Sequence, residues 1–585
     1  MTIELNETQK AMLSGERGLA KQMGMRLLLD MAAAAGSDEL IPIKSAHISG
    51  VSPLTGGLGL RLFLARLGSE EGVSMAIPTT LNSAGCDEAQ FAEMKIVAPD
   101  FLEHNHEIVE LYTKLGIRPT QSCIPYEWEG VVVEGEAAWA ESNAICFGNS
   151  YTGLITNRES GLSALACALT GYSPKYGLLH EEARQPNLEV IVTAEMTEPA
   201  DFSILGDWIG MQREPHWRTP YGPIPVIRGL PSNLSHEQKK ALTAAAANYG
   251  SPLLYVEGQR PIPEGDFQAQ LIFDADALAQ RYGDLQPQTA VSLIVIGCPQ
   301  ASVGEIRAVA KLLNGRSLSP DAPPLWVFTS AHNKAIAEKT GLADIIRQSG
   351  ALLLENTCPE VVPYDRSWVK HILSNSMKAE HYIKSGLNGI PTSVMKLADC
   401  VGLALGDWTV EGNQQQTNQA GNKKAAKKRA LAGGQAKAEQ ATGNFAADGK
   451  GLPSQDDFEV TGEAFVTDTP ITLLGFVNRQ TGVIEEPGHP ADGESIAGKI
   501  AIFPKGSGST VAPYVLLELF YRSNAPLAVV NTEIDQQSTP ACSLENIPYG
   551  FEFNDDIIGK INHGDVVQLK RTGTTVTLKV VERKK

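Results

Sequence analysis

Apolar and polar positions alternate along the middle of the chain in the pattern of buried strands followed by amphipathic helices. The segment Val291–Gly297 (VSLIVIG) is a nearly continuous apolar run, which is typical of a strand buried on both faces. The same pattern predicts two more strands and three helices nearby: strands Leu325–Ser330 and Ala351–Leu354, and helices Ser302–Leu313, Asn333–Thr340 and Ser374–Ser385. Regular alternation of strand and helix predicts a parallel sheet that is covered on both sides.

The two ends of the chain differ in the secondary structure that their residue patterns predict. Residues Leu5–Gly36 carry apolar side chains at helical spacing and predict an amphipathic helix. Toward the other end the chain is rich in predicted strands, with one helix: strands in Glu459–Val466, Ile471–Leu474, Ile500–Phe503, Leu527–Val530 and Val566–Val581, and helix Tyr514–Tyr521. Residues 458–585 are therefore predicted to form a compact, β-dominated small domain.

Between these regions lies a segment of low complexity, residues 411–457. It is rich in Gln, Ala, Lys, Gly and Asn and nearly empty of large apolar side chains. Such a composition cannot bury enough surface to offset the entropy lost on ordering. We therefore expect a flexible linker between a large part, residues 1–410 with several α/β subdomains, and the small domain. Its basic run would also suit a nucleic-acid-binding segment, but a solvated tether is the favoured interpretation.

Composition narrows the classes of function. The chain has 585 residues, 43% of them hydrophobic, and a formal net charge of −18. A net negative charge argues against nucleic acid or an anionic membrane surface as a partner. The first residues are acidic and lack the apolar core of a secretory signal, and no apolar run of about 18 residues occurs. We expect a cytoplasmic, monomeric protein that acts on a small molecule.

Three of the eight cysteines share a local setting. Cys123 (SCIPY), Cys298 (GCPQ) and Cys358 (TCPE) are followed by proline, directly or one residue later. Two of them are predicted just beyond the carboxyl ends of strands, where parallel sheets bind ligands. Cysteine followed closely by proline also recurs in iron–sulfur ligand loops. The pattern predicts a shared metal site; the alternative is that each thiol is a small buried apolar group.

A polar stretch at residues 141–160 supplies candidate substrate contacts. Its donors and acceptors lie among small residues: Ser142, Asn143, Asn149, Ser150, Thr156, Asn157 and Arg158. A guanidinium beside amides suits a substrate that carries a carboxylate, and Arg158 is the candidate clamp. The alternative is a set of turns and helix caps, which Asn and Ser also favour.

A glycine-rich loop precedes the predicted helix of the small domain. The loop Pro504–Pro513 (PKGSGSTVAP) contains Lys505, Ser507 and Ser509. Backbone amides at the start of a helix bind anions and could stabilise a serine alkoxide. The Walker pattern of nucleotide-binding loops is missing, and a plain turn is the alternative.

These motifs together resemble a known family. PTTLNSAGCD, SCIPY, AESNAICFGNS, TNRESG, GCPQAS and ENTCP are similar to the catalytic large part of aconitase X, and GFVNRQTGVI, PKGSGSTVAPYVLLEL and NAPLAVVNTE resemble its swivelling small domain. The resemblance covers nearly the whole chain apart from the linker. In many members the two parts are separate subunits, whereas here they look fused.

The resemblance implies an α/β fold of stacked aconitase-like subdomains, closed by a swivelling β/β/α domain. It also implies an iron–sulfur cluster, either 2Fe–2S or 4Fe–4S, with Cys123, Cys298 and Cys358 at the ligand positions and Ser509 at the position of the catalytic serine. Two departures stand out. Gln300 occupies the position where many members have histidine, and Cys86 competes as a ligand.

The family's known activities are dehydrations. Fused bacterial members act on cis-3-hydroxy-L-proline, yielding Δ1-pyrroline-2-carboxylate, and two-subunit archaeal members act on phosphomevalonate. The fused layout favours the first substrate; phosphomevalonate and a non-catalytic scaffold are the alternatives. The chemistry requires a Lewis acid for the leaving hydroxide and a cation such as Arg158 for the developing enolate-like charge. It also requires a base such as Ser509, activated by backbone amides and by a cation such as Lys505 or Arg158.

Overall fold

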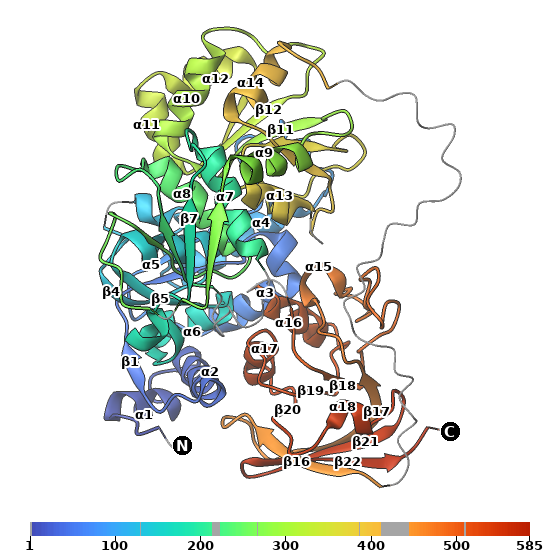
Figure 1. The fold of residues 1–585 in the computed structure, drawn as a ribbon. Helices are drawn as coiled ribbons and strands as arrows, with labels where there is room; N and C mark the ends of the chain where they lie inside the picture. Colours follow the sequence, from blue (N-terminus) through green and yellow to red (C-terminus); the bar gives the residue numbers. More distant parts are fainter. Residues whose placement is uncertain are drawn as a thin grey trace.

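The computed structural model of the chain describes residues 3–584, apart from 129, 213–222, 266, 385–386, 411–443 and 508–510. Three parallel sheets with helices between them make up the large part, and a closed barrel makes up the small part (Figure 1). This α/β architecture, with stacked subdomains and a separate C-terminal domain, is the fold class expected from the sequence.

The first subdomain is built on a parallel sheet in the order β3-β2-β4-β5. Its strands are β2 (Ala46–Ile48), β3 (Thr79–Leu81), β4 (Gly135–Trp139) and β5 (Leu154–Arg158), and a small antiparallel pair is formed by β1 (Leu40–Pro42) and β6 (Tyr172–Pro174). Its helices are α1 (Glu7–Leu13), α2 (Leu19–Ala35), α3 (Pro53–Leu67), α4 (Phe101–Lys114), α5 (Ser142–Tyr151) and α6 (Gly161–Thr170).

The helix predicted over Leu5–Gly36 is in fact two helices, α1 and α2. The chain breaks between them because Gly15 and Gly18 adopt φ values of 87° and 97°, which a right-handed helix does not contain. The apolar spacing continues across the break, so the sequence pattern alone did not show it.

The second subdomain carries the parallel sheet β10-β7-β8-β9. Its elements are β7 (Leu188–Val192), β8 (Pro225–Arg228), β9 (Tyr255–Val256), β10 (Ala269–Phe273), α7 (Pro199–Met211), α8 (His236–Ala247) and α9 (Ala275–Asp284). Helix α8 lies beside α7 and α5, and it also contacts β11 of the third subdomain. It therefore connects all three subdomains.

The third subdomain confirms the predicted parallel sheet, in the order β13-β12-β11-β14-β15. Its elements are β11 (Leu293–Ala301), β12 (Leu325–Thr329), β13 (Leu352–Glu355), β14 (Ile372–Ser374), β15 (Thr392–Val394), α10 (Val303–Leu313), α11 (Ala331–Lys339), α12 (Leu342–Ser349), α13 (Met377–Lys384) and α14 (Leu397–Leu405). Alternate residues of β11 belong to two different apolar clusters. Leu293 and Val295 pack into one cluster, and Ile294 and Ile296 pack into the other. The strand is thus buried on both faces, which explains its unbroken apolar run.

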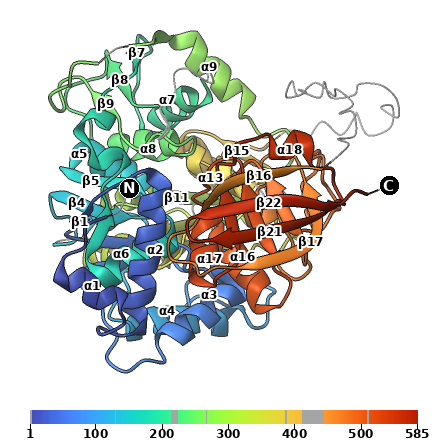
Figure 2. The same ribbon diagram turned by 90° about the horizontal axis from the view of Figure 1, so that it is seen from below.

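The small domain is a closed barrel in the order β16-β20-β19-β18-β17-β21-β22. Its elements are β16 (Ala446–Gly451), β17 (Glu459–Val466), β18 (Ile500–Phe503), β19 (Ala528–Asn531), β20 (Tyr549–Phe551), β21 (Val566–Thr572), β22 (Thr575–Glu582), α15 (Leu473–Phe476), α16 (Pro513–Tyr521), α17 (Thr539–Leu544) and α18 (Ile557–Lys560). Figure 2 shows α16 and α17 on the side of the barrel that faces α2 and α3.

Two expectations about the small domain need correction. Residues 446–451, assigned to the linker, form β16 and pair with β22 and β20, while residues 411–443 lie outside the described part of the chain. Strand pairing there uses backbone groups, so the sparse apolar side chains concealed it. The predicted strand Ile471–Leu474 makes one bridge, from Ile471 to Gly506, and then turns into the short helix α15.

Candidate active site

Three cysteines from three loops meet at one cavity of about 70 Å³. Cys298 lies in β11 where its register against β12 shifts between Ile296 and Ala301. Cys358 follows β13, and Cys123 precedes the short 3-10 helix η1 (Pro125–Glu127). All three side chains are buried. The structure thus places all three cysteines in the lining of one cavity.

Neighbouring polar groups hold the backbone of these loops. Asn143 Nδ2 donates to the carbonyl of Cys123 at 2.8 Å, and the Ser376 hydroxyl donates to the carbonyl of Cys298. The backbone N–H of Gln300 donates to the sulfur of Cys123 at 3.3 Å. The thiols therefore sit on backbone that is fixed from several sides, as a preorganised ligand set requires.

A buried lysine lies between two carboxylates at the cavity wall. Lys378 Nζ is 2.9 Å from Glu141 Oε1 and 3.1 Å from Glu360 Oε1. Asn82 Nδ2 donates to the other oxygen of Glu141 at 2.7 Å, and the thiol of Cys298 donates to Glu360 at 3.1 Å. The arrangement connects the cysteine cluster to a fixed, paired set of charges.

Burial and these charges shift the pKa values of the groups at the cavity. Burial, followed by the charge of Glu141, raises the pKa of Cys123 to about 12. Burial also raises the pKa of Glu360, although Lys378 opposes the rise. For Glu141 burial acts in the same direction, but the Lys378 ammonium outweighs it and the pKa is lowered. Glu141 is therefore ionised more readily than Glu360.

Arg158 also reaches the cavity, from the end of β5. Its Nε is buried and has no hydrogen-bond partner within the described residues. Ser142, at the start of α5, lines the same cavity and accepts a hydrogen bond from Lys378 at 3.4 Å. A half-buried guanidinium whose Nε is an unused donor suits an anionic group that enters the cavity.

Comparisons with known proteins agree on one family. The models of the Aconitase X first, third and swivel domains match residues 2–182, 291–406 and 455–578. The phosphomevalonate dehydratase large subunit of Thermococcus kodakarensis is 34% identical over 65% of this chain and 95% of its own length. The cis-3-hydroxy-L-proline dehydratase of Pseudomonas aeruginosa is 31% identical over 69% of this chain and 70% of its own.

The chain belongs to the aconitase X family. A crystal structure of aconitase X from Thermococcus kodakaraensis, in its holo-form, matches 69% of this chain and all of that chain with 32% identity and a TM-score of 0.62. A small-subunit relative, from the phosphomevalonate dehydratase of Methanopyrus kandleri, is 34% identical over 19% of this chain. The relatives are dehydratases, so this aconitase X is a hydro-lyase.

Four residues predicted to bind substrate have structural roles in this aconitase X. They are not among the described residues that line the cavity. Their side chains instead hydrogen-bond to the backbone of neighbouring segments: Asn149 to Thr156 and Pro252, Ser150 to Leu254, Thr156 to Trp139, and Asn157 to Tyr176 and Leu178. Asn143 acts on the loop of Cys123 instead. Amides favour such backbone contacts as readily as substrate contacts, which the sequence could not distinguish.

The small domain completes the cavity wall with Leu474 and Val511. Lys505 forms an ion pair with Glu533 at 2.6 Å and is half-exposed, and Ser507 shares a 2.7 Å hydrogen bond with Thr472. Ser509, the predicted base, lies outside the described residues. Neither Lys505 nor Ser507 is among the described residues that line the cavity, so the structure does not place them at the site.

Several residues at the cavity were not identified from the sequence. The sequence motifs do not single out Lys378 or Glu360, while Glu141 belongs to the polar stretch 141–160 and Asn82 to the motif PTTLNSAGCD. Glu360 stands two residues after Cys358, a position that its motif could have drawn attention to. Lys378 lies in α13 without any local signal, because its importance comes from the carboxylates that surround it in space.

The three cysteines at the cavity are the candidate ligands of a metal centre. Within the described residues, no group of three or more His, Cys, Asp or Glu side chains is close enough together to hold a metal ion. The donor chemistry nevertheless fits iron and sulfur, because three buried thiols line one cavity. Cys86, the alternative ligand, is buried in an apolar cluster with Met94 and Phe101 and is not among the described cavity-lining residues.

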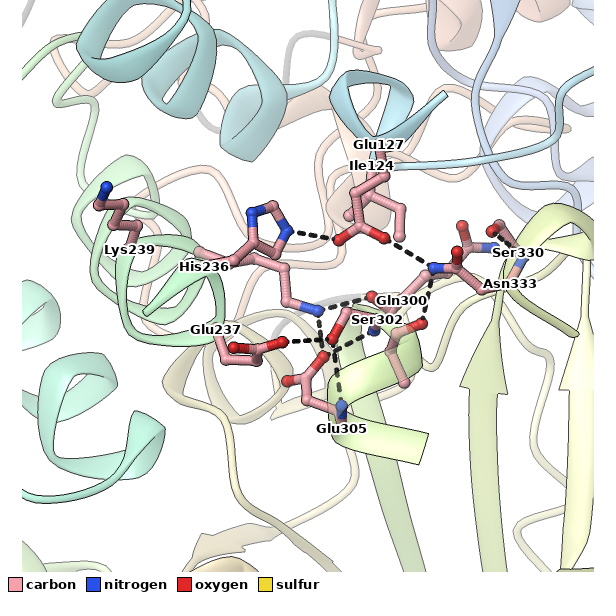
Figure 3. A network of polar contacts seen from close by, with 12 residues as sticks. Ile124, Glu127, His236, Glu237, Lys239, Gln300, Ser302, Glu305, Ser330 and Asn333 are labelled. Atoms are coloured by element: carbon pink, nitrogen blue, oxygen red, sulfur yellow. Dashed lines mark hydrogen bonds and ion pairs between the residues drawn. The ribbon is translucent and has the colours of Figure 1, made fainter. Parts of the chain in front are cut away.

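Figure 3 shows a second polar network, which includes Glu127, His236, Gln300 and Glu305. The fully buried Lys240 of α8 donates to the carbonyl of Gln300 at 2.8 Å and forms an ion pair with Glu305. Glu127, in η1 after Cys123, lies 2.7 Å from His236 and accepts from Asn333 at 2.7 Å. These contacts join the second and third subdomains to the loops that carry Cys123 and Cys298.

No helix within the described residues is long and apolar enough to cross a membrane.

Proposed function

We propose that this aconitase X removes water from cis-3-hydroxy-L-proline, giving Δ1-pyrroline-2-carboxylate, with an iron–sulfur cluster held by Cys123, Cys298 and Cys358. The observation that carries the choice of substrate is the balance of charge at the cavity. The ionisable side chains other than Cys and Tyr among its described lining are Arg158, Lys378, Glu141 and Glu360, two cations and two carboxyls. A zwitterionic amino acid suits such a balanced wall.

The alternative substrate, phosphomevalonate, is supported by the relatives that carry that name. It brings a phosphate and a carboxylate, which together carry about three negative charges near neutral pH. Lys378 is already paired with two carboxylates. Within the described lining, Arg158 is left as the cation without a carboxylate partner, and one guanidinium does not balance such a trianion.

The residues of the chain divide the reaction between the two faces of the substrate. Arg158 binds the carboxylate and stabilises the enolate-like charge that develops when the proton on C2 leaves. Lys378 keeps Glu141 ionised and fixes its orientation beside the cavity. When bound, the cluster supplies a Lewis acid for the departing hydroxyl. Exclusion of water by Val51, Leu474 and Val511 strengthens these electrostatic contacts.

The base is proposed to come from the small domain, with Ser509 as the candidate and Ser507 as its rival. In cis-3-hydroxyproline the hydrogen on C2 and the hydroxyl on C3 lie on opposite ring faces. Anti elimination therefore places the base and the Lewis acid on opposite sides of the substrate. A base on the small domain and cysteines on the large part satisfy that requirement, because both parts contribute to the cavity wall.

An assay of the purified, anaerobically reconstituted protein against both substrates tests the proposal. We expect formation of Δ1-pyrroline-2-carboxylate from cis-3-hydroxy-L-proline and no turnover of phosphomevalonate. Turnover of phosphomevalonate alone would show that the charge balance was misjudged. Full turnover by protein that contains neither iron nor sulfide would remove the cluster from the proposal.

A further inference from the structure

Gln300 contacts all three of the loops that carry the cavity cysteines. It stands two residues after Cys298, and its side chain is completely buried. Its Nε2 donates to the carbonyl of Gln121 at 3.2 Å and to the carbonyl of Thr357 at 3.0 Å. Gln121 lies two residues before Cys123, and Thr357 immediately precedes Cys358. One amide group thus bridges the backbones of two cysteine loops from a position on the third.

The backbone of Gln300 makes further contacts with the same region. Its N–H donates to the sulfur of Cys123 at 3.3 Å, and its carbonyl accepts from Lys240 Nζ at 2.8 Å. Lys240 is itself fixed by the ion pair with Glu305, a residue of the first turn of α10. Gln300 is therefore held at its backbone while its side chain holds the two other loops.

We infer that Gln300 is a positioning residue that brings the three thiols to one place before any cluster binds, and that Lys240 anchors it. The physical reason is entropic. The three loops are far apart in sequence, and ordering them together costs conformational entropy that a preformed clamp removes from the binding step. Neither of these side chains is among the described residues that line the cavity, so they act through the loops. The inference rests on the cluster in the proposed function.

The small domain offers a matched control residue, Gln455. It is also buried, and its Nε2 also donates to two loop carbonyls, those of Cys542 and Ile547, at 3.1 and 2.7 Å. The Oε1 atoms of Gln300 and Gln455 are both buried without a hydrogen-bond partner within the described residues. Replacement of either residue by methionine removes two similar hydrogen bonds at nearly constant volume, but only Gln300 touches the cysteine loops.

The experiment compares full-length wild-type protein with Gln300→Met and Gln455→Met after anaerobic reconstitution. Iron and sulfide per chain, the rate of iron loss to a chelator and the melting temperature are measured for each. We expect Gln300→Met to lose iron at least about tenfold faster than wild type, the scale seen when a ligand-supporting contact is removed. Gln455→Met should keep the wild-type rate, while both variants melt at lower temperature. Gln300→Asn, which keeps the amide but is too short to reach both carbonyls, should be intermediate.

The outcomes separate this inference from the proposed function. If Gln300→Met retains iron as well as wild type does, the clamp is not needed and the inference is wrong. If both methionine variants lose iron equally fast, the loss follows general stability, which also overturns it. Should Gln300→Met not fold, Gln300→Asn is compared with Gln455→Asn on the same criteria. Absence of iron and sulfide from the reconstituted wild type would contradict the proposed function itself.

Discussion

At the scale of single residues, the surroundings of Cys298 differ from those of an ordinary buried cysteine. Its thiol donates to Glu360, and the charge of Lys378 lies close by. Burial, followed by the charge of Glu360, raises the pKa of Cys298. Binding of the proposed cluster at this thiol would therefore release a proton.

Replacement of Cys298 by serine should lower the iron content and abolish turnover, because a buried hydroxyl is a poor ligand for iron–sulfur clusters. Iron and sulfide analysis of the reconstituted variant checks this. Cys86→Ala is the control, and it should keep its iron, since Cys86 is not among the described residues at the cavity. Full iron content in Cys298→Ser would show that Cys298 is not a ligand. Loss of iron in Cys86→Ala would show that Cys86 is one.

Ser509→Ala should lower kcat by about 10²–10⁴-fold, the range expected when a general base is removed. The spectrum of the cluster should remain intact, because the serine is proposed to act on the substrate and not on iron. Exchange of solvent deuterium into C2 of the substrate should vanish together with turnover. If exchange continues at the wild-type rate, Ser507→Ala becomes the variant to examine.

At the scale of elements, the end of β11 shows how a strand can present a ligand. The strand stops pairing regularly after Ile296, and Gly297 adopts a φ of 98° there. A Cβ on Gly297 would lie 2.1 Å from the carbonyl oxygen of Phe328 in the adjacent strand. Only glycine fits this position, and the resulting turn directs the following Cys298 toward the cavity.

Gly297→Ala should therefore destabilise the protein and reduce its iron content. We expect a loss of at least about 2 kcal/mol in the free energy of unfolding, from the backbone conformation and the steric contact combined. Gly315→Ala is the matched control: its φ is 72°, but nothing lies within 4 Å of the added Cβ. Denaturant unfolding and iron analysis of both variants check the expectation, and equal losses in the two would contradict it.

At the scale of the whole molecule, polar contacts fasten the barrel to the first subdomain. Arg479 donates to the carbonyl of Thr55 at 2.6 Å, and Tyr514 to that of Ser49 at 3.2 Å. Asp30 on α2 accepts from the N–H of Ser454 at 2.8 Å and from the hydroxyl of Ser543. Thr55 and Ser49 also line the cavity, so the contacts between the barrel and the first subdomain border the site.

Asp30 makes this contact dependent on pH. Burial raises its pKa to about 6, in spite of the hydrogen bonds from Ser454 and Ser543. The folded protein then binds this proton more tightly than the unfolded chain, so the Asp30 contribution to stability is present at low pH and is lost as pH rises toward about 6. The free energy of unfolding of Asp30→Asn relative to wild type should therefore increase by about 3 kcal/mol between pH 4 and 6, and the difference should stay constant above pH 6.

Denaturant unfolding of wild type and Asp30→Asn across this range checks the expectation. Asp38→Asn, in the exposed loop after the same helix, controls for the loss of one negative charge. A difference between Asp30→Asn and wild type that does not change with pH would show that Asp30 is not the titrating group.

Cleavage of the chain near Gly434, outside the described residues, should leave two parts that still associate and react. The contacts of Arg479, Tyr514 and Asp30 are made outside the connecting segment, which we expect to set only the effective concentration of the parts. Size-exclusion chromatography and an activity titration of the cut protein check this. Loss of activity even at high concentrations of both pieces would contradict a tethering role.

The sequence by itself determined the family, the parallel sheet of the third subdomain and the three cysteines that line the cavity. A strand such as β11, buried on both faces, leaves a continuous apolar run, and cysteine next to proline forms a short local motif; both signals lie in adjacent residues. The limits of the elements were less well determined. The break between α1 and α2 and the strand β16 depend on backbone conformation and pairing, which side-chain patterns reflect only weakly.

Only the tertiary structure decided which polar side chains serve the site. Asn149 and Ser142 belong to the same helix and looked equivalent in sequence, yet one holds backbone carbonyls and the other lines the cavity. Lys378 and Gln300 act through partners more than fifty residues away in the chain, at Glu141 and at Thr357. Such roles arise from distances between side chains that folding brings together, and electrostatic and hydrogen-bond energies depend on those distances and not on separation along the sequence.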